Sequence, residues 1–192
     1  MRDILICGLM FFATGTFAVA FCQEGKSEVH LVKSSDGPVE RQYDRFKDET
    51  TLTLKPQRIL DSSSPRQVIE MTIKTTFDGV RPKDLTDAIQ ITFTSAAEEE
   101  PDYNGESLHF TVDGERVKRY ELSVLPPATT LKPALAPDLK KSEDIYAVIS
   151  FPALYQIANG KKVEMKLGPT ELTLDTKTLE NLRKFSVAIF GK

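Results

Sequence analysis

An alternation of apolar and polar residues over positions 66–77 constrains the fold of this chain more than any other feature. In this run, RQVIEMTIKTTF, apolar side chains recur with a period of two. Successive side chains of a β-strand point to opposite faces, so the run predicts a strand with one buried and one wet face. Residues 88–93 and 50–55 repeat the pattern, and Pro56 is expected to end the second run because proline cannot donate a ladder hydrogen bond. The alternation predicts antiparallel pairing.

Two hairpins are predicted from turn residues. Residues 41–49 are expected to pair with the run 50–55 through a turn at 47–49. Asp113-Gly114 is a favoured two-residue turn, because both of its positions tolerate a positive φ. The apolar phase shifts after this turn, so we expect a bulge near residues 118–119.

The C-terminal third combines strands and helices. Residues 143–151 are apolar on both faces and predict a central strand, followed by a short helix with Ser150 as its cap and a left-handed stop at Asn159-Gly160. Two strands are expected about Gly168-Pro169, and then an amphipathic helix capped by Asp175 or Thr176. The predicted fold class is α+β, mainly β: an antiparallel sheet or β-sandwich with two short helices in the C-terminal third.

The N-terminus predicts export. Residues 1–20 read as a cleaved signal peptide, with the small residues Ala18 and Ala20 at the cleavage site. Lipid attachment at Cys22 is disfavoured by the bulky Phe21 before it. We therefore expect a periplasmic or extracellular protein with no stable membrane span after cleavage, and Cys22 as its single thiol, which cannot form an intramolecular disulfide.

The mature chain is expected to hold one domain. A polar lead-in covers residues 21–39, and a single β-rich domain covers 40–192, with a proline-rich loop at 126–141. The formal net charge is −3 and no run of lysine or arginine is present, so we expect no nucleic-acid partner.

Motifs for catalysis or metal binding are absent from the sequence. It contains no Gly-x-Ser-x-Gly elbow, no phosphate-binding glycine loop and no Cys-x-x-Cys pair, and its only histidines are His30 and His109. His109 is expected on the solvent face of a strand. The acidic segment 98–106 offers weak calcium ligands, although a solvated loop explains it more simply. These candidates are Glu99, Asp102, Asn104 and Glu106.

These observations favour a binding protein over an enzyme. The expected function is an exported, non-enzymatic interaction module for a protein or an envelope component, with no cofactor and no assigned catalytic residue. A carboxylate-dependent hydrolase acting on an envelope or extracellular polymer is the alternative, and a lipid-carrying β-structure with an apolar cavity is a third hypothesis. The overall plan, a signal followed by strands and the ending LYQIANGKKVEMKLGPTELTLDTKTLENLRKF, resembles that of small exported bacterial proteins without an assigned activity.

Overall fold

The computed structural model describes residues 31–63, 66–82, 88–98, 103, 105–124, 139 and 141–190. The predicted signal peptide with Ala18 and Ala20, the thiol of Cys22 and most of the proline-rich loop lie outside the described residues.

A seven-stranded antiparallel sheet forms the larger part of the molecule, in the order β1-β2-β3-β4-β5-β10-β9. It begins at Leu31, within the segment expected as a polar lead-in. Its long central strands share the alternating pattern seen in the sequence. The strands are β1 (Leu31–Asp36), β2 (Val39–Asp44), β3 (Glu49–Ser63), β4 (Arg66–Asp78), β5 (Ile89–Ala97), β10 (Lys141–Ile149) and β9 (Ser123–Val124).

A second, smaller antiparallel sheet has the order β12-β11-β6-β7, and β8 also pairs with β6. Its strands come from the Asp113-Gly114 hairpin and from the strands about Gly168-Pro169. They are β6 (Ser107–Val112), β7 (Glu115–Arg116), β8 (Tyr120–Glu121), β11 (Val163–Leu167) and β12 (Thr170–Thr173).

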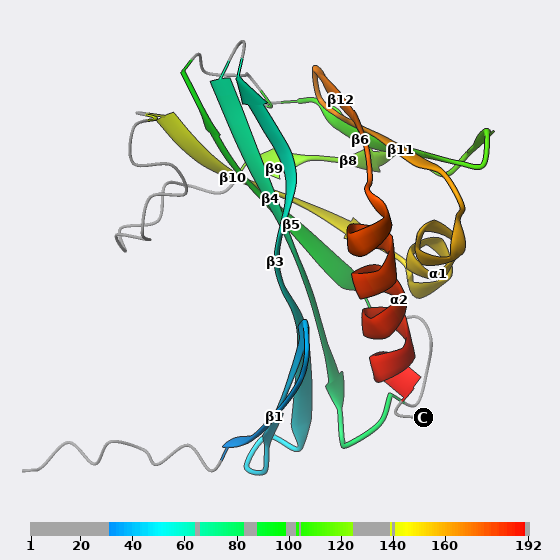
Figure 1. Ribbon diagram of the computed structural model, residues 1–192. Helices are drawn as coiled ribbons and strands as arrows, with labels where there is room; N and C mark the ends of the chain where they lie inside the picture. The colour runs from blue at the N-terminus through cyan, green and yellow to red at the C-terminus, as the bar shows by residue number, and fades with distance from the viewer. Residues whose placement is uncertain are drawn as a thin grey trace, which may run out of the picture.

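Two helices complete the fold, α1 (Phe151–Asn159) and α2 (Thr176–Phe190). They pack against each other, and α2 lies along the larger sheet at β3 and β2. Figure 1 shows the helices and the smaller sheet on the same side of the larger sheet. The structure confirms the predicted class, which is α+β and mainly β, with both helices in the C-terminal third.

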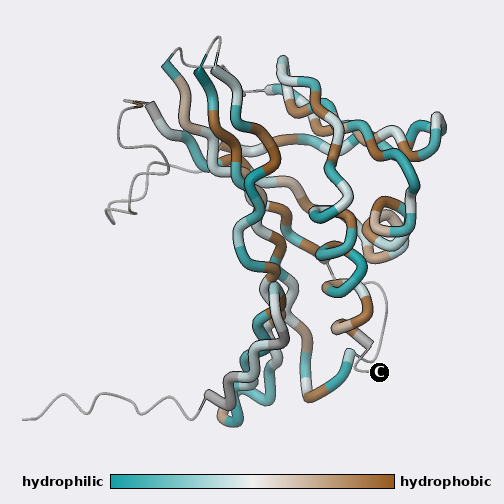
Figure 2. The backbone as a smooth tube through the Cα atoms, viewed as in Figure 1, coloured by the Kyte–Doolittle hydropathy of each residue, from teal (hydrophilic) through white to brown (hydrophobic). Residues whose placement is uncertain are grey.

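The main apolar core of the described residues lies between the larger sheet and the elements that cover it. Strands contribute their alternate residues, and Figure 2 shows the matching alternation of hydrophobic and hydrophilic residues along them. Leu52 and Phe93 of the larger sheet, Phe110 of the smaller one and Phe185 of α2 are at most 1% exposed. Because they belong to one cluster, burial of apolar surface joins the two sheets and the helices into one unit.

β3 corrects the prediction that Pro56 ends its ladder. The strand runs on to Ser63, and its register with β4 shifts between Leu54 and Gln57. The irregularity therefore accommodates the proline that has no N–H to donate. The Gln57 side chain donates to the Lys55 carbonyl oxygen (2.7 Å) and accepts from the Asn181 side chain of α2 (2.6 Å), so polar contacts hold this distorted segment.

Two expectations near α1 are also corrected. β10 lies inside the larger sheet between β5 and β9, as predicted, but it is buried on one face only, because Val148 is 50% exposed and Tyr146 is partly exposed. Gly160 ends the helix with an extended conformation (φ −60°, ψ 148°) rather than a left-handed one. A Cβ atom there would lie 2.7 Å from Cγ1 of Val112, so close packing against the smaller sheet explains the glycine.

Both predicted hairpins are present. The first turns at residues 45–48, slightly earlier than the predicted 47–49. In the second, Val112 pairs with Glu115, whereas Leu108 pairs with Tyr120, which leaves one extra residue between the two pairs on the returning strand. This irregularity confirms the predicted bulge.

Candidate functional site

The outer face of the smaller sheet carries the most concentrated group of chemically active side chains among the described residues. On β6, Leu108, Phe110 and Val112 point into the core. Strict alternation therefore places His109 and Thr111 on the opposite, outer face. His109 lies on the wet side of a strand, as the sequence predicts.

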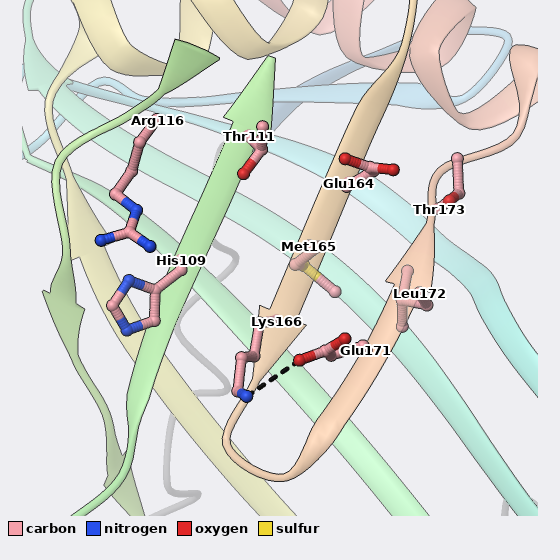
Figure 3. Close-up of a pocket in the computed structure, with 9 residues that line it drawn as sticks. All are labelled: His109, Thr111, Arg116, Glu164, Met165, Lys166, Glu171, Leu172 and Thr173. Atoms are coloured by element: carbon pink, nitrogen blue, oxygen red, sulfur yellow. Dashed lines mark hydrogen bonds and ion pairs between the residues drawn. The ribbon is translucent and has the colours of Figure 1, made fainter. Parts of the chain in front are cut away.

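Strand register brings polar side chains from three further strands beside those of β6. Lys166 of β11 pairs with His109 on one side and Glu171 of β12 on the other. In the next outward-facing row, Glu164 lies between Thr111 and Thr173, and Arg116 of β7 pairs with Thr111. Together with Met165 and Leu172, these side chains line a hollow of about 610 Å³ (Figure 3).

Both carboxylates in the hollow are engaged by lysines. The Lys166 ammonium lies 2.9 Å from the Glu171 carboxylate, and this contact lowers the pKa of Glu171 and raises that of Lys166. Glu164 forms an ion pair with Lys162 at 2.5 Å. Each acid therefore has a lysine as its close neighbour.

Two arginines at the same face lack such partners. Within the part of the chain that the structure describes, Arg116 and Arg119 form no ion pair and no side-chain hydrogen bond. Both are exposed and close enough to influence the titration of His109. Figure 3 shows the Arg116 guanidinium beside the His109 ring. The hollow therefore has uncompensated positive charge on its β7 side.

The environment of His109 favours the neutral form of its ring. Partial desolvation and then the positive charges of Arg119, Arg116 and Lys166 hold the pKa of its imidazole below the ordinary value of 6.5. Its Nε2 lies 2.9 Å from the Ser107 hydroxyl oxygen, and Ser107 is only 7% exposed. The ring is thus held by a hydroxyl from its own strand.

The structure describes only part of the predicted calcium segment. Glu99, Asp102 and Asn104 lie outside them, while Glu106 is exposed and uses its backbone N–H and carbonyl oxygen in bonds to Tyr103 and Leu122. No group of three or more His, Cys, Asp or Glu residues suited to a metal ion occurs within the described ranges.

Sequence reasoning located His109 but missed the hollow. Each strand shows its outward residues by alternation, yet the pairing of β6 with β11, more than fifty residues away, depends on a register that no local pattern reveals. The residues from β11 and β12 were expected only as strand residues about Gly168-Pro169.

Comparisons of this chain with protein-family models, with curated proteins and with solved structures found no match. None of the described helices has both the length and the apolar character needed to cross a membrane.

Proposed function

We propose that this protein is an exported, non-enzymatic binding module that holds a protein or an envelope component at the outer face of its smaller sheet. One observation carries the proposal: a polar hollow is built across β6, β7, β11 and β12, on a sheet whose other face belongs to the core. Side chains mounted on paired strands lie in fixed positions, which reduces the entropy lost when a ligand binds.

The chemistry of the hollow supports binding rather than catalysis. A carboxylate pair that acts as acid and base needs one member with a raised pKa. Glu171 instead has a lowered pKa beside Lys166, and Glu164 is paired with Lys162. Neither carboxylate is therefore marked as a general acid, and the arrangement suits recognition.

Export is proposed from the N-terminal sequence, where an apolar stretch ends at Ala18 and Ala20. Mass spectrometry of the mature protein from fractionated cells tests this part. We expect a mature N-terminus just after Ala20 and recovery from the periplasm or the medium. Peptides from residues 4–16 in the mature band would contradict cleavage.

Site-specific photo-crosslinking tests the binding face itself. Thr111→benzoylphenylalanine places a reactive group within the hollow, and Lys74→benzoylphenylalanine places it on the outer face of the larger sheet. We expect the first variant, in intact cells, to capture a specific protein or envelope component that the second does not. Equal capture by both variants would contradict a dedicated binding face.

A hydrolase acting on an envelope or extracellular polymer is the second candidate, because Ser107 and His109 are within hydrogen-bonding distance. A serine nucleophile must reach its substrate, yet Ser107 is almost fully buried. Release of soluble fragments from purified envelope polymer, lost in both Ser107→Ala and His109→Gln, would favour this candidate over the binding module.

A further inference from the structure

We propose that the group recognised at this face is an oxyanion carried by a polymer, held mainly by Arg116 and Arg119 beside His109. This inference rests on the proposed function and adds the chemical class of the ligand. Phosphate, sulfate and carboxylate groups share the features that the site would recognise: negative charge and several acceptor oxygens.

The distribution of charge across the hollow is the first observation that favours an oxyanion as the ligand. Lys166 and Lys162 already face carboxylates at short range, so their charges are largely offset. Arg116 and Arg119 have no such partner among the described residues. An arginine guanidinium presents several N–H donors in a planar fork that matches an oxyanion. An incoming anion would therefore find donors that do not have to be released from other contacts.

Hydroxyl groups that line the hollow are the second observation that favours an oxyanion. Thr111 pairs with Arg116 across the β6–β7 ladder, and Thr173 lies in the same row beyond Glu164. Both threonines line the hollow. A hydroxyl can donate one hydrogen bond to an anion. Figure 3 shows Arg116 and Thr111 on one side of the hollow and Thr173 on the other side, beyond Glu164, so Thr111 is the neutral donor closest to the arginine.

The charges around the His109 ring are the third observation that favours an oxyanion. The ring faces cations from β7, the segment after it and β11, namely Arg116, Arg119 and Lys166, and it contacts the Ser107 hydroxyl from its own strand. The carboxylate of Glu171 belongs to the same row but is paired with Lys166. An oxyanion near the arginines would offset their repulsion and favour the imidazolium, which adds a further donor. Binding should therefore strengthen as the pH falls through the range in which His109 titrates.

The charge of the whole chain makes the inference specific to this face. The formal net charge is −3, so a polyanion is repelled by the protein as a whole. Attraction must come from a local patch. Lys74, exposed on the outer face of the larger sheet, offers a matched single cation outside the hollow.

Equilibrium binding of the full mature chain to three defined polymers tests the inference: dextran sulfate, inorganic polyphosphate and uncharged dextran. We expect both polyanions to bind and uncharged dextran not to bind. Arg116→Gln should weaken binding about tenfold or more, because a hydrogen bond between charged groups is lost. Lys74→Gln should leave it within about twofold. The two polyanions distinguish sulfate from phosphate as the better group.

The pH dependence gives an independent readout. Binding by the wild-type chain should tighten between about pH 7 and pH 5, and His109→Gln should remove most of this gain. Equal weakening by Arg116→Gln and Lys74→Gln would show diffuse attraction and overturn the inference. Equal binding of uncharged dextran would also overturn it.

Failure of the inference and failure of the proposed function give different results. If none of the three polymers binds while Thr111→benzoylphenylalanine still captures a specific partner, the face binds something other than an oxyanion polymer and only the inference is overturned. If crosslinking from this face is also no more specific than from Lys74, both are overturned.

Discussion

The outer faces of the two sheets share one architecture but differ in chemistry. On the larger sheet, several outward-facing polar groups have partners: the hydroxyl oxygens of Thr51 and Thr76 lie 3.3 Å apart, Thr94 donates to Asp144 at 2.6 Å, and Arg58 forms a cross-strand ion pair with Glu70. Lys74 is exposed there as a single cation. On the smaller sheet, Arg116 lines a hollow, and neither it nor Arg119 in the segment after β7 has an ion-pair partner among the described residues. We therefore expect the face that groups unpartnered cations around one hollow to bind an anionic ligand, and the face with isolated charges not to do so.

The two sheets differ outside but share one core, and removing a core side chain tests this with the largest expected effect. Phe185→Ala should lower the free energy of unfolding by about 3–5 kcal/mol, because it leaves a cavity in the common cluster. Urea denaturation followed by circular dichroism measures the loss. Val187→Ala, at a position 55% exposed on the same helix, should change it by less than about 0.5 kcal/mol. Two separate transitions, of which only one shifts, would show that the sheets are independent.

Glycines beside the two sheets are expected to differ in their contribution to stability: Gly160 packs closely against the smaller sheet, whereas Gly37 forms a turn of the larger one. Gly160→Ala should cost about 1–3 kcal/mol, because the added Cβ would overlap the buried side chains of Val112 and Val163. Gly37 in the β1–β2 turn has open space around it but a φ of +61°, which asparagine tolerates. Gly37→Asn should therefore be nearly neutral in the same denaturation assay. A larger cost at Gly37 than at Gly160 would contradict this account.

The cap of α2 lies where the chain leaves the smaller sheet for the larger one. Hydrogen bonds from Thr178, including its backbone N–H at 2.7 Å, hold the pKa of Asp175 below its usual value. The capping contribution is therefore present above the unfolded-state pKa and is lost as the pH falls through the lower folded-state pKa. Asp175→Ala should cost about 1 kcal/mol at neutral pH, measured by thermal or urea unfolding. Asp175→Asn, which keeps a capping oxygen, serves as the control and should cost much less.

The smallest expected effect is on the pH dependence of the free energy of unfolding, through the desolvation of His109 and the positive charges around it. Because its pKa is lowered in the folded chain, the unfolded chain binds a proton first as the pH falls. Stability should therefore decrease as the pH drops below about 6.5, the ordinary histidine value. His109→Gln should flatten this dependence in urea titrations between about pH 7 and pH 5. An unchanged slope would show that the pKa of His109 is not lowered in the folded chain.

Sequence reasoning predicted the strands because one buried and one wet face imposes alternation, which is visible in residues 66–77 without any tertiary information. Turn chemistry likewise located the hairpin at Asp113-Gly114 and its bulge. The continuation of β3 past Pro56 was missed, because it depends on a register irregularity and on Asn181 of α2, which is distant in sequence.

The candidate site was predicted only in part. Alternation placed His109 on a wet face, but the hollow requires β6 and β11 to pair in one register, which aligns His109 with Lys166. The acidic segment 98–106 gave the calcium candidates because carboxylates are dense there in the sequence. Local density is easily seen in a sequence, whereas the arrangement around Arg116 arises from strands that are distant in the chain.

Nuclear magnetic resonance of the His109 ring, with inorganic polyphosphate as the probe, tests whether the outer face of the smaller sheet binds an oxyanion polymer. The chain has only two histidines, so His109→Gln assigns the signal. We expect polyphosphate to raise the pKa of His109. It should also shift the backbone amide resonances of β6, β7, β11 and β12 and leave those near Lys74 unchanged. An unchanged His109 pKa, or equal shifts on the outer faces of both sheets, would contradict this expectation.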